Sequence, residues 1–184
     1  MGKGLVGMEK EKIISTLNEF FTKGSKRVEV ITPSNLVNIQ EGPRLDLIIR
    51  HLAIEEMMGK NKIGLALWEK LGRFKGNPFE NRKIRLQRLI EGFKEHGGYN
   101  IAYPIKEVDS LYQLWGGSHR IVMSLRYNVK YIPIVRDTEY RIPQKKRDRI
   151  GYSDWNLPKF GYTHEEIEYI KELYDANVLK INEE

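Results

Sequence analysis

Two adjacent glycines, Gly116 and Gly117, stand between a strand-like stretch and a helix-like stretch, and this arrangement constrains the fold more than any other feature. Ser118, His119 and Arg120 follow them and open the helical pattern, after which the chain again resembles a strand. Glycine lets the backbone adopt positive φ and approach a neighbouring group closely. The pattern therefore predicts a strand, a tight turn, a short helix and a second strand in immediate succession.

The other elements are predicted from apolar spacing and from end signals. Helices are expected over 8–21, 45–58, 61–72, 77–98, 118–127 and 163–174, and strands over 27–33, 99–108, 110–115 and 130–135. Pro104 places its strand at a sheet edge or makes it a strand end. Thr163 and Glu166 have the spacing of a capping box at the start of the last helix. Residues 34–44 are expected to form a connection.

This order of elements predicts one α+β domain, close to the α/β class, over residues 1–184. A helical insertion of about residues 44–97 follows the first strand, and a C-terminal helical extension covers about 151–184. With 40% hydrophobic residues the chain can bury one core, and helix should exceed strand.

Composition excludes several function classes. The chain has no cysteine, so thiol catalysis, disulfides and cysteine-bound zinc are excluded. Its histidines lack the spacing of a metal-binding helix, so no dedicated protein metal site is expected. No apolar run approaches the roughly 20 residues that span a bilayer, and no signal peptide is recognisable, so we expect a cytoplasmic protein without membrane contact. The net charge of +6 favours an anionic partner.

The segment from Gly116 to Arg120 has two interpretations. As an anion site, it offers close backbone approach at the glycines, N–H groups of a first helical turn, and donors from Ser118, His119 and Arg120. As an ordinary corner, it uses Ser118 as a helix cap and leaves Arg120 on the surface. The five residues alone do not separate these interpretations.

The flanking residues add a resemblance. Gly-Gly-x-His-Arg after a short strand, followed by a small amphipathic helix, "IP" and a final strand, resembles the ParB/sulfiredoxin superfamily. The resemblance covers Ile105 to Val135, and "VEVITP" corresponds to the opening strand of the family. Residues 42–99 resemble the core only loosely and look like an insertion. The resemblance implies a small mixed sheet with flanking helices and a phosphate-binding turn.

Two branches of this superfamily fit the chain poorly. Sulfiredoxin requires a cysteine in the motif, where this chain has Ser118. The partition proteins bind CTP and DNA and carry a helix-turn-helix after the nucleotide domain. Here about fifty residues follow Val135, and their clear helix is acidic.

The third branch contains small-molecule kinases similar to the free serine kinase. The resemblance then implies transfer of phosphate from ATP or ADP, with Mg²⁺, to a small hydroxyl-bearing acceptor. Gly116 to Arg120 would hold the phosphates, and Glu41 and His119 would be the catalytic residues. Arg44 and Asp46 are candidates for orienting the acceptor or a metal.

Alternatives stay open at each of these positions. Glu41 fits an exposed loop residue, and Arg44 and Asp46 fit charges at a helix start. A non-catalytic nucleotide- or nucleic-acid-binding module, including a ParB-like DNA binder or a nuclease, is the second functional hypothesis; it would use the basic run Lys145 to Arg149. Trp115 fits core packing better than stacking on a base.

The helical insertion also has two interpretations: it either covers the nucleotide site or only supports the core. The charged side chains of its last helix are expected to face solvent. The sequence does not predict an oligomeric state.

Overall fold

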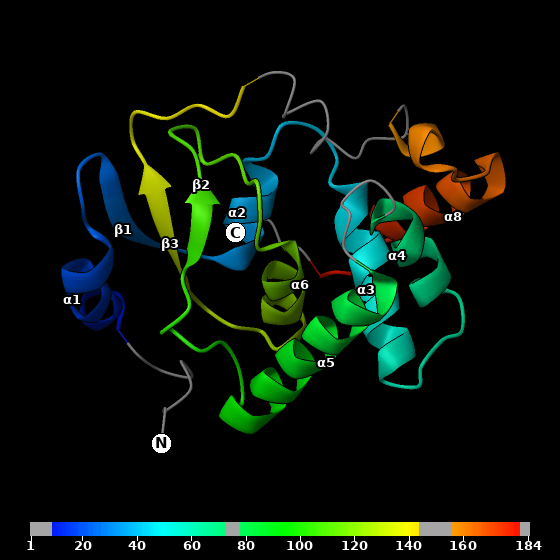
Figure 1. The fold of residues 1–184 in the computed structure, drawn as a ribbon, viewed down its shortest axis with the longest axis horizontal. Helices are drawn as coiled ribbons and strands as arrows, with labels where there is room; N and C mark the ends of the chain where they lie inside the picture. The colour runs from blue at the N-terminus through cyan, green and yellow to red at the C-terminus, as the bar shows by residue number, and fades with distance from the viewer. Residues whose placement is uncertain (1–8, 73–77, 144–155, 181–184) are drawn as a thin grey trace.

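The computed structural model describes residues 9–72, 78–143 and 156–180 and contains one small mixed sheet (Figure 1). The strands β1 (Lys26–Ile31), β2 (Ile105–Val108) and β3 (Ile132–Asp137) lie in the order β1-β3-β2. β1 pairs antiparallel with β3, and β2 pairs parallel with β3. A parallel pair needs a crossover, and the helix between β2 and β3 supplies it.

Helices pack around this sheet, and more of the described residues are helical than extended. They are α1 (Lys10–Phe21), α2 (Pro33–Asn38), α3 (Leu45–Met57), α4 (Gly64–Gly72), α5 (Phe79–His96), α6 (Ser118–Arg126), the 3-10 helix η1 (Leu157–Phe160) and α8 (His164–Asp175). Figure 1 shows α1 beside β1, with α3, α4 and α8 on the opposite side of the molecule. α3 packs against α4, α6 and α8, and α5 packs against α6. The predicted α+β class is confirmed, and the helices α2, α3, α4 and α5 lie between the first two strands.

One local prediction holds in part and another in detail. β2 lies at the edge of the sheet, as Pro104 indicated, but it begins directly after this proline and covers only Ile105–Val108, so residues 99–104 of the predicted strand do not form one. α8 begins with the predicted capping box: the Thr163 hydroxyl accepts from the Glu166 N–H, and the Glu166 carboxylate accepts from the Thr163 N–H. None of the described helices has the length and apolar character to cross a membrane.

Two local predictions are wrong. Residues 110–115 do not form a strand; only an isolated bridge joins Leu114 to Val108, and Tyr112 has a positive φ of 62°. The predicted connection after β1 contains α2, because Thr32 caps the Asn35 N–H and Pro33 occupies the first helical turn. Residue 77, where the helix predicted over 77–98 was expected to begin, lies outside the described residues.

Candidate functional site

The glycine turn before α6 packs closely against β2, the strand that precedes it. Gly117 has φ of 86°, and a Cβ at this position would lie 2.9 Å from the Ile105 side chain of β2. A larger residue would therefore meet both backbone strain and a steric clash. Gly117 is also the N-cap of α6, so Ser118 is the first residue of the helix and the prediction that Ser118 caps it is wrong.

The loop that leads to this turn is organised by Asp109. This buried carboxylate accepts from the Leu111 N–H at 2.8 Å, the Gln113 N–H at 2.9 Å and, across the fold, the Ile142 N–H at 3.0 Å. These backbone partners explain why the segment turns instead of continuing as a strand. Asp109 is thus a structural residue.

Two amide side chains join the same loop to the connection between α2 and α3. The Gln40 carbonyl oxygen accepts from the Leu114 N–H at 3.0 Å, and the Gln40 amide donates to the Tyr112 carbonyl at 2.8 Å. In the reverse direction, the Gln113 oxygen accepts from the Glu41 N–H at 3.0 Å. The chain before α3 is therefore held beside the motif turn.

A buried ion-pair network lies directly behind the turn. The Asp46 carboxylate accepts from Arg44 Nε at 2.7 Å and from Arg50 Nη1 at 2.6 Å. Arg44 Nη2 also donates to the Ser118 hydroxyl at 3.1 Å. We call Arg44, Asp46 and Arg50 the Asp46 network. It fixes the start of α3 against the start of α6.

The Asp46 network does not have the geometry expected of metal-orienting or acceptor-binding groups. Burial alone would raise the pKa of Asp46, but the charges of Arg44 and Arg50 hold it below its usual value of 3.8. Asp46 is fully buried and Arg44 is 3% exposed. No group of three or more His, Asp or Glu that could hold a metal occurs in the described part of the chain. Arg44 and Asp46 therefore position the motif: Asp46 holds Arg44, and Arg44 contacts Ser118 at the start of α6.

A cavity of about 560 Å³ opens in front of the turn, at the N-terminus of α6. Its described lining residues are Gly117, His119 and Arg120 from the motif, with Trp68 from α4 and Arg82, Arg85, Leu86 and Leu89 from α5. We call it the motif cavity. The last two helices of the insertion thus face the predicted anion site.

Trp68 holds two side chains that line the motif cavity, those of His119 and Arg82. The His119 ring packs edge-on against the Trp68 ring, with their centres 5.2 Å apart. The Arg82 guanidinium lies 4.5 Å from the Trp68 ring centre and donates to the Trp68 carbonyl at 2.8 Å. Since Trp68 itself is buried, it fixes the His119 ring and the Arg82 guanidinium at the wall of the motif cavity.

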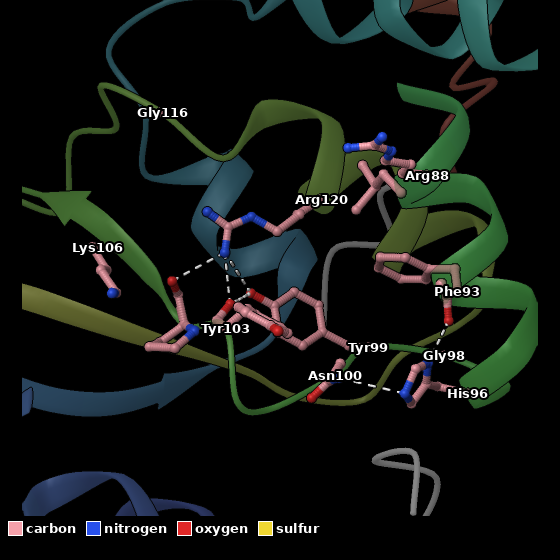
Figure 2. Close-up of a pocket in the computed structure, with 13 residues that line it drawn as sticks. Arg88, Phe93, His96, Gly98, Tyr99, Asn100, Tyr103, Lys106, Gly116 and Arg120 are labelled. Atoms are coloured by element: carbon pink, nitrogen blue, oxygen red, sulfur yellow. Dashed lines mark hydrogen bonds between the residues drawn. The ribbon is translucent and has the colours of Figure 1, made fainter. Parts of the chain in front are cut away.

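A second cavity, of about 840 Å³, adjoins the first (Figure 2). Arg120 and Leu89 line both. The other described lining residues are Arg88, Gly92, Phe93, His96, Gly98, Tyr99, Asn100, Tyr103, Pro104, Lys106 and Gly116. We call it the aromatic cavity. The two cavities meet at Arg120.

Arg120 has a structural role as well as a position between the cavities. One guanidinium nitrogen donates to the carbonyls of Tyr103 at 2.6 Å and Pro104 at 3.0 Å, which Figure 2 shows as dashed lines. Burial raises the pKa of Tyr99 to about 12, so this phenol is neutral, and it donates to the Tyr103 carbonyl at 2.6 Å. Arg120 therefore anchors the loop that forms one wall of the aromatic cavity.

The two cavities are cationic. Among the described residues that line them, none is Asp or Glu, whereas the basic side chains are Arg82, Arg85, Arg88, Lys106 and Arg120. We call the four arginines of this set the cavity arginines. Together with the positive end of α6, they give these cavities a field that attracts anions.

The sequence predicted Arg120 but missed Arg82, Arg85 and Arg88, which were expected to face solvent. Their spacing of three places them on one side of α5, and the neighbouring Leu86 and Leu89 share that side. This repeated spacing was the available signal. Arg85 and Arg88 remain exposed while lining the cavities, so periodicity alone assigned them to the outer surface.

Glu41 and Trp115 lie apart from these cavities. The Glu41 carboxylate belongs to an exposed residue that lines neither cavity. Trp115 is 42% exposed, so the prediction of core packing is wrong.

Among the predicted site residues, the structure brings Gly116, Gly117, His119 and Arg120 to the cavities. It places Ser118 against Arg44 and does not bring Glu41 to the cavities. The basic run Lys145 to Arg149 lies outside the described residues.

Comparisons with protein-family models, with curated proteins and with solved structures find no match to this chain.

Proposed function

We propose that this protein binds a nucleoside polyphosphate, ATP or ADP with Mg²⁺, and transfers a phosphoryl group to a small hydroxyl-bearing acceptor. The phosphates occupy the motif cavity, at the N-terminus of α6. The observation that carries the proposal is that a helix N-terminus and arginines from two helices face one cavity whose described lining contains no carboxylate. Phosphate oxygens are the ligands that such a set of donors suits best.

The motif residues have separate roles in this proposal. Gly116 and Gly117 allow close backbone approach, and Arg85 and Arg120 neutralise phosphate charge. The Ser118 hydroxyl accepts from Arg44 and keeps its own proton for donation to a phosphate oxygen. Because phosphoryl transfer depends mainly on positioning and on charge neutralisation, this donor set supplies most of what the reaction needs.

The residues present set the requirements for Mg²⁺ and for a base. With no carboxylate in the described lining, Mg²⁺ is held by the phosphates of the nucleotide, as the resemblance to the kinase branch implies. In the reaction, the acceptor oxygen bonds to the terminal phosphorus while the bond from that phosphorus to the leaving nucleotide breaks; the leaving nucleotide is ADP when ATP is the donor and AMP when ADP is the donor. The hydroxyl proton passes to a base, for which Glu41 is the candidate.

A non-catalytic nucleotide-binding module is the second candidate. The exposed position of Glu41 outside both cavities favours it. Replacing Glu41 with Gln decides between the two: a phosphotransferase loses turnover with little change in nucleotide affinity, whereas a binding module shows no turnover in either protein. The assay is product detection from labelled ATP with Mg²⁺ across a set of hydroxyl compounds.

Calorimetric titration with Mg·ATP, Mg·ADP and CTP tests the binding itself. Arg85→Gln should weaken binding roughly tenfold, because it removes a charged donor from the motif cavity. Lys94→Gln is the matched control, since Lys94 is an exposed cation of the same helix that lines neither cavity. Failure of every nucleotide to bind the wild type, or equal weakening by both substitutions, would contradict the proposal.

A further inference from the structure

Helix α4 contacts both the motif cavity and the C-terminal part of the chain. At the cavity, its Trp68 contacts the His119 ring and the Arg82 guanidinium. The same helix is contacted by residues 156–175, which contain η1 and α8 and which we call the C-terminal unit. Figure 1 shows α8 beside α4, at the end of the molecule away from α1. None of the described residues that line the two cavities belongs to the C-terminal unit.

Two side chains of the C-terminal unit hold α4. The Tyr162 hydroxyl belongs to a buried residue and donates to the Leu67 carbonyl. The Lys70 ammonium donates to the two carboxylate oxygens of Glu166 at 2.7 and 2.6 Å. It also lies 5.3 Å from the centre of the Tyr162 ring. The side chains of this ion pair are 18% and 29% exposed, so solvent screens it less than a pair on the open surface.

Two consecutive carbonyls of α4 connect the C-terminal unit to the wall of the motif cavity. The Leu67 carbonyl accepts from Tyr162. The Trp68 carbonyl, the next in the chain, accepts from Arg82 at 2.8 Å. Because regular helical geometry fixes neighbouring carbonyls relative to one another, they move together. A displacement of this turn of α4 therefore moves Arg82 and, through the Trp68 ring, His119.

The first turn of α4 is fixed separately, against α3 and the loop that follows α3. The Asn61 side-chain oxygen accepts from the Gly64 N–H at 3.1 Å, and the Glu56 carboxylate accepts from the Leu65 N–H at 2.7 Å. In the described structure, the side chains that make polar contacts with the turn of residues 67–70 come from Arg82 and the C-terminal unit. The C-terminal unit is thus the polar anchor of this turn on the side away from the ligand.

We propose that Tyr162 and Glu166 are positioning residues of the motif cavity. They hold the turn of α4 that carries Trp68, and Trp68 orients His119 and Arg82 toward a phosphate. The C-terminal unit then belongs to the nucleotide site without contacting the nucleotide. Its contribution is sensitive to small movements, because a misplacement of about 1 Å is enough to weaken a directed contact. This inference rests on the proposed function for its ligand, whereas the contacts that carry it are those of the free protein.

Conservative substitutions remove each contact and keep the rest of the side chain. Glu166→Gln loses the charged bond to Lys70, while a glutamine can still complete the capping box with Thr163. Tyr162→Phe keeps the ring and loses the hydroxyl. Each substitution should weaken Mg·ATP binding about threefold to tenfold in a calorimetric titration.

Two controls accompany these variants. Lys70→Arg can still donate to the Glu166 carboxylate and should bind Mg·ATP like the wild type. Glu168→Gln removes an ion pair within α8 itself and should leave the affinity unchanged.

Double and triple variants separate positioning from a general loss of stability. In Arg82→Gln/His119→Gln, both of the residues to be positioned are gone. Adding Glu166→Gln should then change affinity by less than about twofold, measured at low salt where the remaining cations act most strongly. Arg85 lines the motif cavity without a described contact to Trp68, so in Arg85→Gln the effect of Glu166→Gln should persist in full. Equal weakening in both backgrounds overturns the inference, as does wild-type affinity in the single variant Glu166→Gln.

The histidine rings give a readout that needs no nucleotide. His119 packs edge-on against Trp68, so the indole shifts its ring resonances in an NMR spectrum of the free protein. Glu166→Gln and Tyr162→Phe should move these resonances and leave those of His96, which lines the aromatic cavity, in place. Unchanged His119 resonances overturn the inference. If Mg·ATP does not bind the wild type, the proposed function fails, and these resonances still decide whether the C-terminal unit positions His119.

Discussion

Two groups of arginines lie on opposite sides of the motif turn, and they differ in what neutralises them. In the Asp46 network, Arg44 and Arg50 are buried and share one carboxylate at 2.7 and 2.6 Å. The cavity arginines line open space whose described lining contains no acid. Burial of an unpaired charge is costly, so the first group had to bring its own counter-ion. The second group keeps its charge available to a ligand because solvent still reaches it.

Breaking the first group should have the largest effect. Asp46→Asn keeps the shape of the side chain but removes the carboxylate charge that two buried guanidinium groups share, which should lower the free energy of unfolding by about 3–5 kcal/mol. Urea unfolding of both proteins measures this difference. The control is Glu80→Gln, which removes an exposed pair with Lys83 at 3.3 Å and should cost less than about 1 kcal/mol.

The same substitution has a pH signature. The folded-state pKa of Asp46 lies below its ordinary value of 3.8, so its stabilising contribution is fully present above that value. It is lost as the pH falls further, through the folded-state pKa. Asp46→Asn should therefore unfold with less dependence on pH below about 4 than the wild type. Equal acid sensitivity of the two proteins would contradict this account of the ion pairs.

The comparison also explains what the sequence could predict. The local signals sufficed where one segment decides its own structure: the capping box of Thr163 and Glu166, and the glycine turn before α6. They failed at residues 110–115, where Asp109 gathers N–H groups that include that of Ile142, distant in the chain. Apolar alternation in that segment resembles a strand, but the long-range partner decides otherwise.

In the candidate site, too, features decided within one segment could be predicted and features decided by packing could not. Gly116 to Arg120 is contiguous, so its pattern was visible in the sequence. The partners of Asp46 are local, since Arg50 follows it at the i,i+4 spacing of a helix. The burial of the Asp46 network and the facing side of α5 depend on how helices pack, which spacing alone does not determine. Arg44 and Asp46 were open between orienting a ligand and acting as helix-start charges, and the structure places them at the start of α3. Arg85 is exposed, as expected, but it also lines the motif cavity.

Arg120 is one of the cavity arginines, but like the arginines of the Asp46 network it also makes hydrogen bonds within the protein. Arg120→Ala should weaken nucleotide binding by about 1.5–3 kcal/mol through loss of a charged donor. It should also destabilise the fold slightly, since the Tyr103 and Pro104 carbonyls lose their donor. Calorimetry and urea unfolding on the same samples separate the two effects. A variant that loses stability but keeps full nucleotide affinity would place Arg120 with the structural arginines.

Ser118 is the motif residue that contacts the Asp46 network, and replacing it should have the smallest effect. Its hydroxyl accepts from Arg44 at 3.1 Å at the first residue of α6. In Ser118→Ala, Arg44 keeps its bond to Asp46 at 3.0 Å, so the free energy of unfolding should fall by only about 0.5–1.5 kcal/mol. If the hydroxyl proton also reaches a phosphate, nucleotide affinity should fall by a similar amount, and the loss should add to that of Arg85→Gln because the two donors act separately. Unchanged affinity would limit Ser118 to joining the Asp46 network to α6.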